Sequence, residues 1–288
     1  NFDGVHLGHQ RLLSELIHRA RAMHCPAGVI TFEPQPQEFF APHPPTRLTS
    51  LRQKYEALQQ QGIDFMLVLR FNDRLASQCA EDFIRHILVD KLKINSLLIG
   101  QDFRFGHGRL GDVALLESMG EQLGFTVAIL PDVTLNGDRV SSTQIRSLLS
   151  AGQLAEAAQL LGRPFSISGK VIPGAARGRT LNMPTANIAL KYPAPVQGIF
   201  VVRVQYGAKH YPGVASLGTR PVFNGKVPLL EVHLLDFDGE LYGQRLAVEF
   251  LHKLRDEADF ASVAHLQVQM QQDLLAAKNY WKTHHDQL

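Results

Sequence analysis

The sequence contains few cysteines, no long hydrophobic run and almost no excess of charge of either sign. Its two cysteines, Cys25 and Cys79, lie far apart and outside any spacing that is typical of a metal site. Such isolated thiols are typical of reduced side chains in the cytosol, so we expect a cytoplasmic location. No apolar run reaches the length of a membrane span, and the first residues lack a signal-peptide pattern. The sequence therefore predicts a protein that does not cross a membrane.

The charge balance gives no indication of a polyanionic partner. The chain has 29 lysine and arginine residues against 27 aspartate and glutamate residues, a formal charge of +2. We therefore expect no nucleic-acid partner. With 288 residues, 45% of them hydrophobic, the chain can bury a large core but is long for a single one. Two domains are expected.

The first part of the chain alternates between helical and strand patterns. Strands are expected at 28–32, 65–69, 96–99 and 125–130, and helices from near Gly8, at 51–60, 81–92, 113–123 and within 142–161. Such alternation predicts a parallel sheet with both faces covered by helices, a Rossmann-like α/β domain. The proline-rich segment 34–45 is expected to be a loop.

The pattern changes after Gly162. Short strand-like runs at 167–172, 198–205, 210–217, 229–235 and 244–251 are separated by glycine and proline, and residues 262–281 have helical spacing. This part predicts a small antiparallel β-barrel with a C-terminal helix. We place the two domains at residues 1–162 and 163–288.

The N-terminal residues form an H-x-G-H sequence, His6 to His9, at the start of the first helix. Free N–H groups and the positive end of a helix favour anions, and Gly8 permits a close approach. The two histidines could then stabilise charge on a reacting phosphate. The alternative is an ordinary helix start with one capping and one exposed histidine. A turn of this kind usually follows a strand, so we expect the natural chain to begin before Asn1.

A second helix start follows the last strand of this domain. Ser141, Ser142 and Thr143 supply hydroxyls, and Arg146 lies one turn into the helix. The alternative is a simple serine cap with a solvated arginine. Because strand ends of such a sheet meet at one crevice, we expect the two helix starts to lie together.

These two signatures resemble those of nucleotidyltransferases, and within them the FAD synthetase domain of bacterial bifunctional enzymes. The segments 31–36 (TFEPQP) and 99–106 (IGQDFRFG) are similar to segments that surround FMN and adenine in that family. The resemblance implies adenylyl transfer from ATP to FMN, with pyrophosphate leaving. It implies catalytic roles for His6, His9 and Arg146. It also implies ligand contacts for Asn1, Gly8, Phe32, Pro34, Asp102, Phe103, Ser141, Ser142 and Thr143.

The second domain opens with a glycine-rich segment followed by Thr185 and Asn187. These two residues alternate, so their side chains are expected on one face of a strand, where their oxygens suit Mg²⁺. The alternative is a glycine-rich turn before a polar strand face. The sequence has no Walker-type G-x-x-x-x-G-K-[ST], which excludes that class of kinase.

The run P-T-A-N at 184–187, with G-T-R-P at 218–221 and L-E-V-H at 230–233, resembles flavokinase. The resemblance implies that Glu231 is the base for the riboflavin 5′-hydroxyl and that Thr185 and Asn187 hold Mg-ATP. It also implies ligand contacts for Gly169, Lys170, Gly174, Gly178 and Arg220. A charged Glu231 in an apolar run needs a partner or a function, and a salt-bridged structural glutamate is the alternative.

Taken together, residues 1–281 resemble the bacterial bifunctional riboflavin kinase/FAD synthetase family. The resemblance implies ATP, riboflavin, FMN and FAD as ligands, Mg²⁺ with ATP, and flavins as substrate and product rather than as a prosthetic group. Two alternatives remain. One is another nucleotidyltransferase or a synthetase-like fragment with an unrelated β-domain, although a synthetase should have a K-M-S-K-S loop, which is absent. The other is a non-catalytic flavin or nucleotide sensor.

Overall fold

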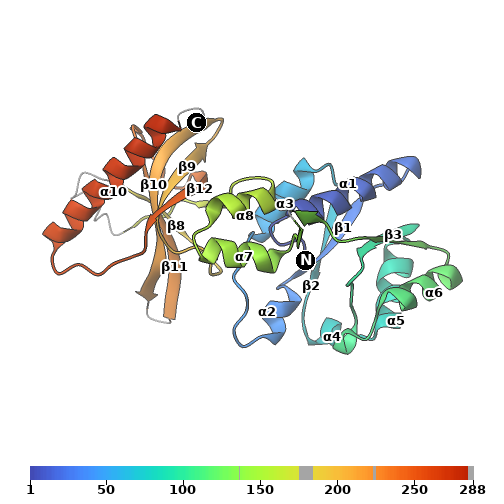
Figure 1. Ribbon diagram of the computed structural model, residues 1–288. Helices are drawn as coiled ribbons and strands as arrows, with labels where there is room; N and C mark the ends of the chain where they lie inside the picture. The colour runs from blue at the N-terminus through green and yellow to red at the C-terminus, as the bar shows by residue number, and fades with distance from the viewer. Residues whose placement is uncertain (136, 175–183, 223–224, 285–288) are drawn as a thin grey trace. The chain divides into compact units, whose positions relative to one another are not determined.

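The computed structural model describes residues 1–135, 137–174, 184–222 and 225–284, without the side chains of residues 219–227. Its contacts divide the chain into two compact units (Figure 1). Unit 1 comprises Asn1–Pro45 and Ser50–Ser141, and unit 2 comprises Thr46–Thr49 and Ser142–Leu288. The division falls before α7 (Ser142–Ser150) and α8 (Leu154–Leu161) rather than after them, because α8 contacts β12 (Arg245–Arg255) of unit 2.

Unit 1 has the predicted alternation of strands and helices. Its main elements are α1 (Leu7–Ala22), β1 (Gly28–Glu33), α3 (Leu51–Gln60), β2 (Phe65–Arg70), α4 (Asp73–Ala76), α5 (Ala80–Asp82), the π-helix η1 (Phe83–Lys91), β3 (Ser96–Gly100), α6 (Val113–Leu123) and β4 (Thr126–Leu130). β1 pairs with β2 and β3 with β4, both in parallel. The predicted Rossmann-like class, with helices between parallel strands, is confirmed.

Three details of unit 1 differ from the sequence prediction. The proline-rich segment contains the short helix α2 (Pro36–Phe40), which forms because Gln35 and Glu38 cap each other and proline is tolerated in the first turn. The hairpin β5 (Thr134–Leu135) with β6 (Asp138–Arg139) and the 3-10 turn η2 (His107–Arg109) are too short to give a periodic pattern. The described parallel strands form two separate pairs rather than one sheet.

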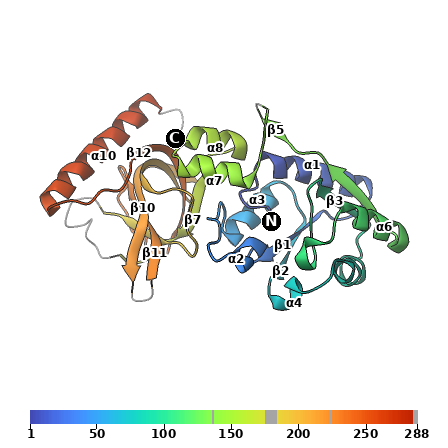
Figure 2. The same cartoon turned by 60° about the horizontal axis from the view of Figure 1, so that its bottom comes forward.

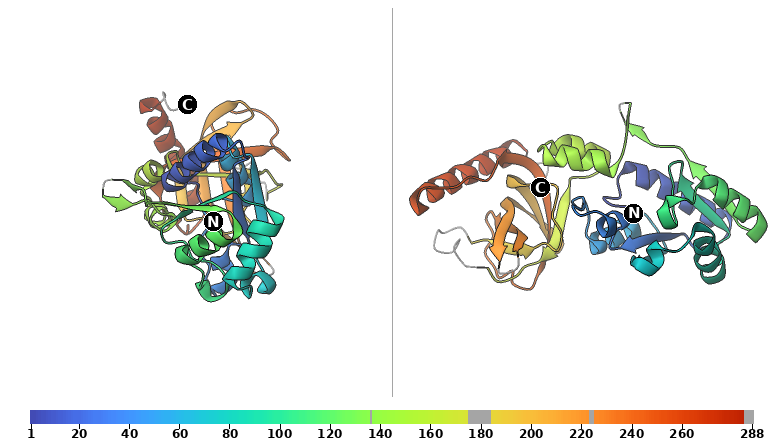
Figure 3. Two further views of the ribbon diagram at one scale, coloured as in Figure 1. Left: turned by 90° about the vertical axis from the view of Figure 1, so that its right-hand side faces the viewer. Right: turned by 90° about the horizontal axis from the view of Figure 1, so that it is seen from below.

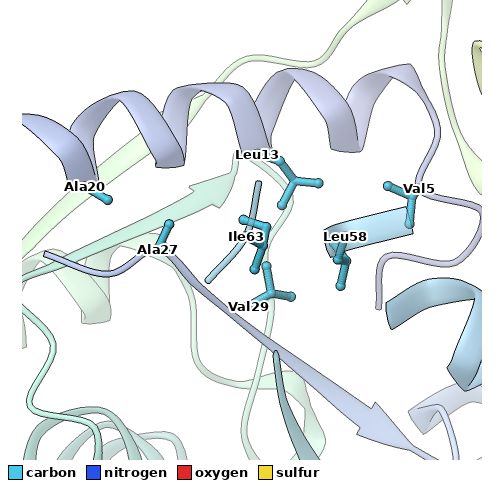
Figure 4. Close-up of a cluster of buried hydrophobic side chains, with 7 residues drawn as sticks. All are labelled: Val5, Leu13, Ala20, Ala27, Val29, Leu58 and Ile63. Atoms are coloured by element: carbon cyan, nitrogen blue, oxygen red, sulfur yellow. The ribbon is translucent and has the colours of Figure 1, made fainter. Parts of the chain in front are cut away.

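An apolar cluster joins α1 to β1 and α3 in unit 1. Figure 4 shows Leu13 of α1 above Ile63 and Val29, with Leu58 of α3 and Val5 to one side and Ala20 of α1 beside Ala27 on the other. Leu13 and Leu58 are almost fully buried. Since Val5 directly precedes His6, this cluster also fixes the chain that enters α1.

Unit 2 contains a six-stranded antiparallel sheet that is nearly closed into a barrel (Figure 2). The strands are β7 (Ser166–Lys170), β8 (Ala186–Ala189), β9 (Gly198–Tyr206), β10 (Lys209–Val222), β11 (Gly225–Leu234) and β12, in the order β7-β12-β9-β10-β11-β8. A bridge between Ile172 and Asn187 links the two edge strands. The predicted barrel and its C-terminal helix, α10 (Val263–Thr283), are confirmed.

The helix α10 lies along the outside of the barrel (Figure 3). Ala277 and Trp281 pack against Ile199 and Val201 of β9, so this strand is buried on both faces. A bidentate ion pair between Arg255 of β12 and Asp273 of α10, at 2.7 Å, adds a polar contact. No helix in the described part of the chain is both long and apolar enough to cross a membrane.

Candidate active sites

The H-x-G-H segment forms the predicted helix start in unit 1. The His6 side chain caps α1 by accepting a hydrogen bond from the His9 backbone N–H, at 3.4 Å. The two imidazole rings stack with their centroids 3.7 Å apart, and Phe2 contacts His9 from the other side. Two charged imidazoles would repel each other at this distance. Stacking at this distance therefore disfavours charging both rings at once.

Gly8 is required by the way that His6 folds over the helix start. A Cβ atom at this position would lie 3.2 Å from the His6 ring and 3.5 Å from the carbonyl oxygen of Val140. The segment that leads to Ser141 thus passes beside the first helix start within unit 1. Close backbone approach is the property that the sequence predicted for this glycine.

The His9 side chain combines burial with an unused hydrogen-bonding atom. Burial lowers the pKa of His9 well below its ordinary value, and the nearby His6 and Lys54 lower it further. Its Nδ1 atom is buried and has no hydrogen-bond partner among the described residues. Orphaned buried polar atoms are rare in proteins and often mark functional positions. His9 is thus held neutral, with one ring nitrogen that the protein leaves unsatisfied.

An apolar cavity of about 300 Å³ in unit 1 brings together other predicted ligand residues. Asn1, Phe32 and Phe103 line it, and the Phe103 ring stacks on Phe105 at 5.5 Å. Residues of β1 and β3 form its walls, so the cavity lies where the two parallel pairs approach each other. Its volume and aromatic lining suit a flat ring system.

Two other predicted residues lie near these strands with different surroundings. Asp102 forms an ion pair with Arg139 of β6, which also contacts Asp132 at 3.0 Å. Both partners are largely exposed, so this pair contributes little to stability and can exchange for a ligand contact. Pro34 directly follows β1 and lies two residues before α2.

The second helix start is divided between the two units. Ser141 belongs to unit 1, whereas Ser142, Thr143 and Arg146 belong to unit 2 and form the start of α7. Arg146 is held within unit 2, where its Nε atom donates to the carbonyl oxygen of Thr46 at 2.6 Å. The helix start is where the sequence predicted it. The expected meeting of the two helix starts stays a prediction.

In unit 2, a pocket of about 140 Å³ brings together Gly174, Thr185 and Asn187. β8 begins at Ala186, so Thr185 lies just before the strand, and yet both predicted metal ligands line the same pocket. Gly174 is tightly packed here, because a Cβ atom on it would lie 2.2 Å from the Asn187 side-chain nitrogen. The glycine is needed so that the asparagine can occupy its position.

The Asn187 side chain provides the test of whether Mg²⁺ fits. Its Nδ2 atom donates to the carbonyl oxygen of Thr185 at 3.3 Å, and this contact orients the amide. The Oδ1 atom is buried and has no hydrogen-bond partner among the described residues. An unpaired amide oxygen, in a pocket that Thr185 also lines, is the kind of hard oxygen ligand that Mg²⁺ prefers. The residues present therefore fit the ion.

Glu231 lies on β11 directly opposite Asn187 of β8 and Ser216 of β10. Directly opposed residues in an antiparallel pair have their side chains on the same face of the sheet. The Glu231 carboxylate is half-buried on the same face as Asn187, while its neighbours Leu230 and Val232 are fully buried on the other face. The strand register thus places a candidate base beside a candidate metal ligand.

Comparisons with known proteins match each half of the chain to a family model. Residues 1–144 match a family model described as FAD synthetase, and residues 161–281 match one described as riboflavin kinase. A Pseudomonas fluorescens protein described as a bifunctional riboflavin kinase/FMN adenylyltransferase is 46% identical over 281 residues, which cover 96% of this chain and 90% of that protein. The chain belongs to this family.

Other relatives extend the match. An Escherichia coli K12 bifunctional riboflavin kinase/FMN adenylyltransferase is 44% identical, with 98% of this chain and 91% of that protein covered. A Streptococcus pneumoniae crystal structure, described as a macrolide-efflux protein, is 30% identical with a TM-score of 0.81 and covers 96% of this chain and 91% of that chain. The resemblance to the bifunctional riboflavin kinase/FAD synthetase family is confirmed.

Within this family fold, the structure adds pocket residues that the sequence did not indicate. The loop between β11 and β12 contributes Phe237, Asp238 and Tyr242 to the unit 2 pocket. His233, two residues after Glu231, bonds through Nδ1 to the carbonyl oxygen of Pro184 at 2.8 Å. Residues alternate between the two faces of a strand, so His233 lies on the same face as Glu231. This alternation could have identified His233 from the sequence. His233 therefore anchors the chain just before Thr185.

The remaining predicted residues of the riboflavin kinase half are less well defined. Gly169 and Lys170 lie on β7, where Gly169 packs closely on Ile188 and Lys170 is exposed. The backbone of Arg220 pairs with Val227 in the β10–β11 ladder. The Arg220 side chain and Gly178 lie outside the described part of the structure.

Proposed function

We propose that the chain phosphorylates riboflavin with ATP to give FMN and then transfers the adenylyl group of a second ATP to FMN, releasing pyrophosphate. The observation that carries this proposal is that the two halves of the chain match two family models, FAD synthetase over residues 1–144 and riboflavin kinase over residues 161–281. We assign the adenylyl transfer to residues 1–162, with Ser142, Thr143 and Arg146 among its proposed residues, and the kinase reaction to residues 163–288.

In the kinase reaction, Glu231 accepts the proton of the riboflavin 5′-hydroxyl as the hydroxyl oxygen bonds to the γ-phosphorus of ATP. The bond from that phosphorus to the bridging oxygen breaks, and ADP leaves. Thr185 and Asn187 would hold Mg²⁺, which supplies charge neutralisation for the ATP phosphates. The unpaired Asn187 Oδ1 supports this assignment. Gly169, Lys170, Gly174, Gly178 and Arg220 are proposed as ligand contacts around it.

In the adenylyl transfer, an oxygen of the FMN phosphate attacks the α-phosphorus of ATP and pyrophosphate leaves. His6 and His9 donate hydrogen bonds to the phosphate oxygens, where charge grows in the transition state. Because the pKa of His9 is lowered, the ring is neutral near neutral pH and still has one N–H to donate. Arg146 is proposed to neutralise the triphosphate. Phe32 and Phe103 are proposed to contact the flavin ring, with Asn1, Pro34 and Asp102 nearby.

One incubation tests both assignments. The full chain is mixed with riboflavin, ATP and Mg²⁺, and the flavins are separated over time. We expect riboflavin to disappear, FMN to accumulate transiently and FAD to follow. A parallel sample with EDTA should show neither product. Unchanged riboflavin would refute the kinase assignment, and failure to convert added FMN would refute the adenylyltransferase assignment. Absence of both activities would support the non-catalytic sensor.

A further inference from the structure

Helix α3 presents a lysine to the interior of unit 1. Among the residues of this polar helix, only Lys54 and Leu58 are buried, and they lie one turn apart on the same face. Leu58 belongs to the apolar cluster with Val5 and Val29. Lys54 is 1% exposed, although lysine is almost never fully buried unless it is paired. Its position at the edge of the cluster therefore needs an explanation.

Thr31 on β1 connects Lys54 to Asn1, the first residue of the loop that leads to His6. The Lys54 Nζ atom donates to Thr31 Oγ1 at 3.2 Å, and Thr31 Oγ1 donates to the carbonyl oxygen of Asn1 at 3.3 Å. Thr31 lies on β1 two residues after Val29, so both point to the face covered by Leu58 and Lys54. The chain of contacts leads from the helix through the strand to the start of the Asn1–His6 loop.

The burial of Lys54 limits what it can do. Lys54 does not line the unit 1 cavity, and its side chain is bonded to Thr31 instead, so we assign it no direct contact with a ligand. The loop that it contacts is itself unusually polar for a buried segment, since Asp3 is 2% and His6 is 6% exposed. Buried polar groups of this kind hold a single arrangement firmly when they are satisfied, and they are costly to disturb.

We propose that Lys54 is a positioning residue of the adenylyl-transfer site: through Thr31 it fixes the Asn1–His6 loop, and so the His6–His9 pair that faces the triphosphate. The proposal rests on the adenylyltransferase function assigned to residues 1–162. It adds to that function a residue outside the H-x-G-H segment and outside the ligand cavity. Correct placement matters because a shift of about 1 Å at a reacting group can lower a rate about 100-fold.

The positive charge of Lys54 also affects the pKa of His9. Burial lowers the pKa of His9, and the neighbouring His6 and the positive charge of Lys54 lower it further. Replacing Lys54 by a neutral residue of similar length should therefore raise the pKa of His9.

A set of conservative variants in the full chain tests the proposal. Lys54→Met keeps the length and removes the charge, Thr31→Val keeps the shape and removes the hydroxyl, and Thr31→Ser keeps the hydroxyl. Arg52→Met, an exposed position on the same helix, is the matched control. The readouts are FMN adenylylation, riboflavin phosphorylation by the same sample, and the pKa of His9 from NMR of labelled histidines.

We expect Lys54→Met and Thr31→Val each to lower kcat for FMN adenylylation by between about 10-fold and 100-fold. Riboflavin phosphorylation should stay within about twofold, and Thr31→Ser and Arg52→Met should stay near wild type. Because the two residues act through one chain of contacts, the double variant should be hardly worse than either single variant. Lys54→Met should also raise the pKa of His9.

Fully additive losses, or a Thr31→Ser variant as poor as Thr31→Val, would overturn the proposal. So would wild-type adenylylation in both Lys54→Met and Thr31→Val. If Lys54→Met does not fold, the Thr31→Val and Thr31→Ser pair decides alone. Failure of the proposed function itself is distinguishable, because the wild-type chain would then make no FAD from FMN.

Discussion

The two active sites of this chain are held in place by different physical means. In unit 1, the helix start rests on buried polar side chains, among them Asp3, His6, Thr31 and Lys54. In unit 2, strand register places Glu231 opposite Asn187, and the surrounding barrel core is apolar. One site depends on electrostatic and hydrogen-bonding contacts, and the other depends on a backbone ladder.

This difference predicts which changes each site tolerates. Removing a polar atom from a buried network leaves its partner unsatisfied, so unit 1 should be sensitive to isosteric polar changes. A β-ladder is insensitive to such changes, but it fixes side chains so closely that one added methyl group can displace them. Unit 2 should therefore be most sensitive to added volume around Asn187. The following predictions test this comparison, beginning with the largest effect.

The largest expected effect comes from substituting one proposed catalytic residue in each site, because each substitution should remove one activity and leave the other. Glu231→Gln keeps the shape and removes the base, so riboflavin phosphorylation should fall about 100-fold or more. His9→Ala should lower FMN adenylylation by about 100-fold or more, since it removes one donor to the developing charge. Each variant should retain the other activity near wild type. Both activities are measured in one assay by separating riboflavin, FMN and FAD.

Equal damage to both activities by Glu231→Gln would indicate misfolding or a shared site. No damage to either would make Glu231 a structural carboxylate, which is the alternative that the sequence left open. The intact second activity is the internal control for folding in each variant.

The second prediction adds one methyl group to the unit 2 pocket. A Cβ atom on Gly174 would lie 2.2 Å from Asn187 Nδ2, so Gly174→Ala must displace the amide that is proposed to hold Mg²⁺. We expect KM for Mg-ATP in riboflavin phosphorylation to rise about tenfold, which corresponds to about 1.4 kcal/mol. Gly100→Ala is the control, because a Cβ atom there would meet nothing within 4 Å. An unchanged KM in the Gly174→Ala enzyme would contradict the proposal that Asn187 helps to hold Mg-ATP.

The sequence predicted the elements with strong periodicity and the residues within recognisable motifs. The alternation of Leu246, Val248 and Phe250 in β12 and the apolar face of α1 were visible without coordinates. Lys54 was not, because α3 is polar at most positions and its sequence does not reveal which side faces the sheet. His233 was within a quoted motif, but its contact with Pro184 depends on which strands pair. Contacts between residues that are far apart in the chain cannot be predicted from the local sequence pattern.

The third prediction concerns His233, which holds the segment that is proposed to bind Mg²⁺. The His233 ring bonds to the carbonyl oxygen of Pro184, next to Thr185, and a phenylalanine would keep the ring but lose the donor. A hydrogen bond of this kind contributes about 0.5–1.5 kcal/mol. His233→Phe should therefore raise KM for Mg-ATP in riboflavin phosphorylation by about three- to tenfold, with kcat less affected. His210→Phe, an exposed position on β10, is the control. An unchanged KM would show that the ladder alone positions Thr185.

The smallest effect should come from an exposed polar contact in unit 1, which contrasts with buried Lys54. Asp64 accepts hydrogen bonds from the Arg21 guanidinium at 3.1 and 3.2 Å and from the Ala27 backbone N–H at 2.7 Å. The hydrogen bonds from Arg21, followed by that from Ala27, lower the pKa of Asp64. A carboxylate with a lowered folded-state pKa stabilises the fold above its unfolded-state pKa, and this stabilisation is lost as pH falls through the folded-state value.

Asp64→Asn should therefore lower Tm by about 1–3 °C near neutral pH, and the difference from wild type should vanish in acid. Asp90→Asn, an exposed carboxylate at the end of η1, is the matched control and should leave Tm nearly unchanged at every pH. Calorimetric unfolding between about pH 1 and pH 7 measures both, because the stabilisation is lost only as pH falls through the lowered folded-state pKa. A Tm difference for Asp64→Asn that persists at the lowest pH would mean that packing rather than charge stabilises this contact. Because Asp64 is exposed, water replaces its lost bonds, whereas no water replaces those of a residue buried like Lys54.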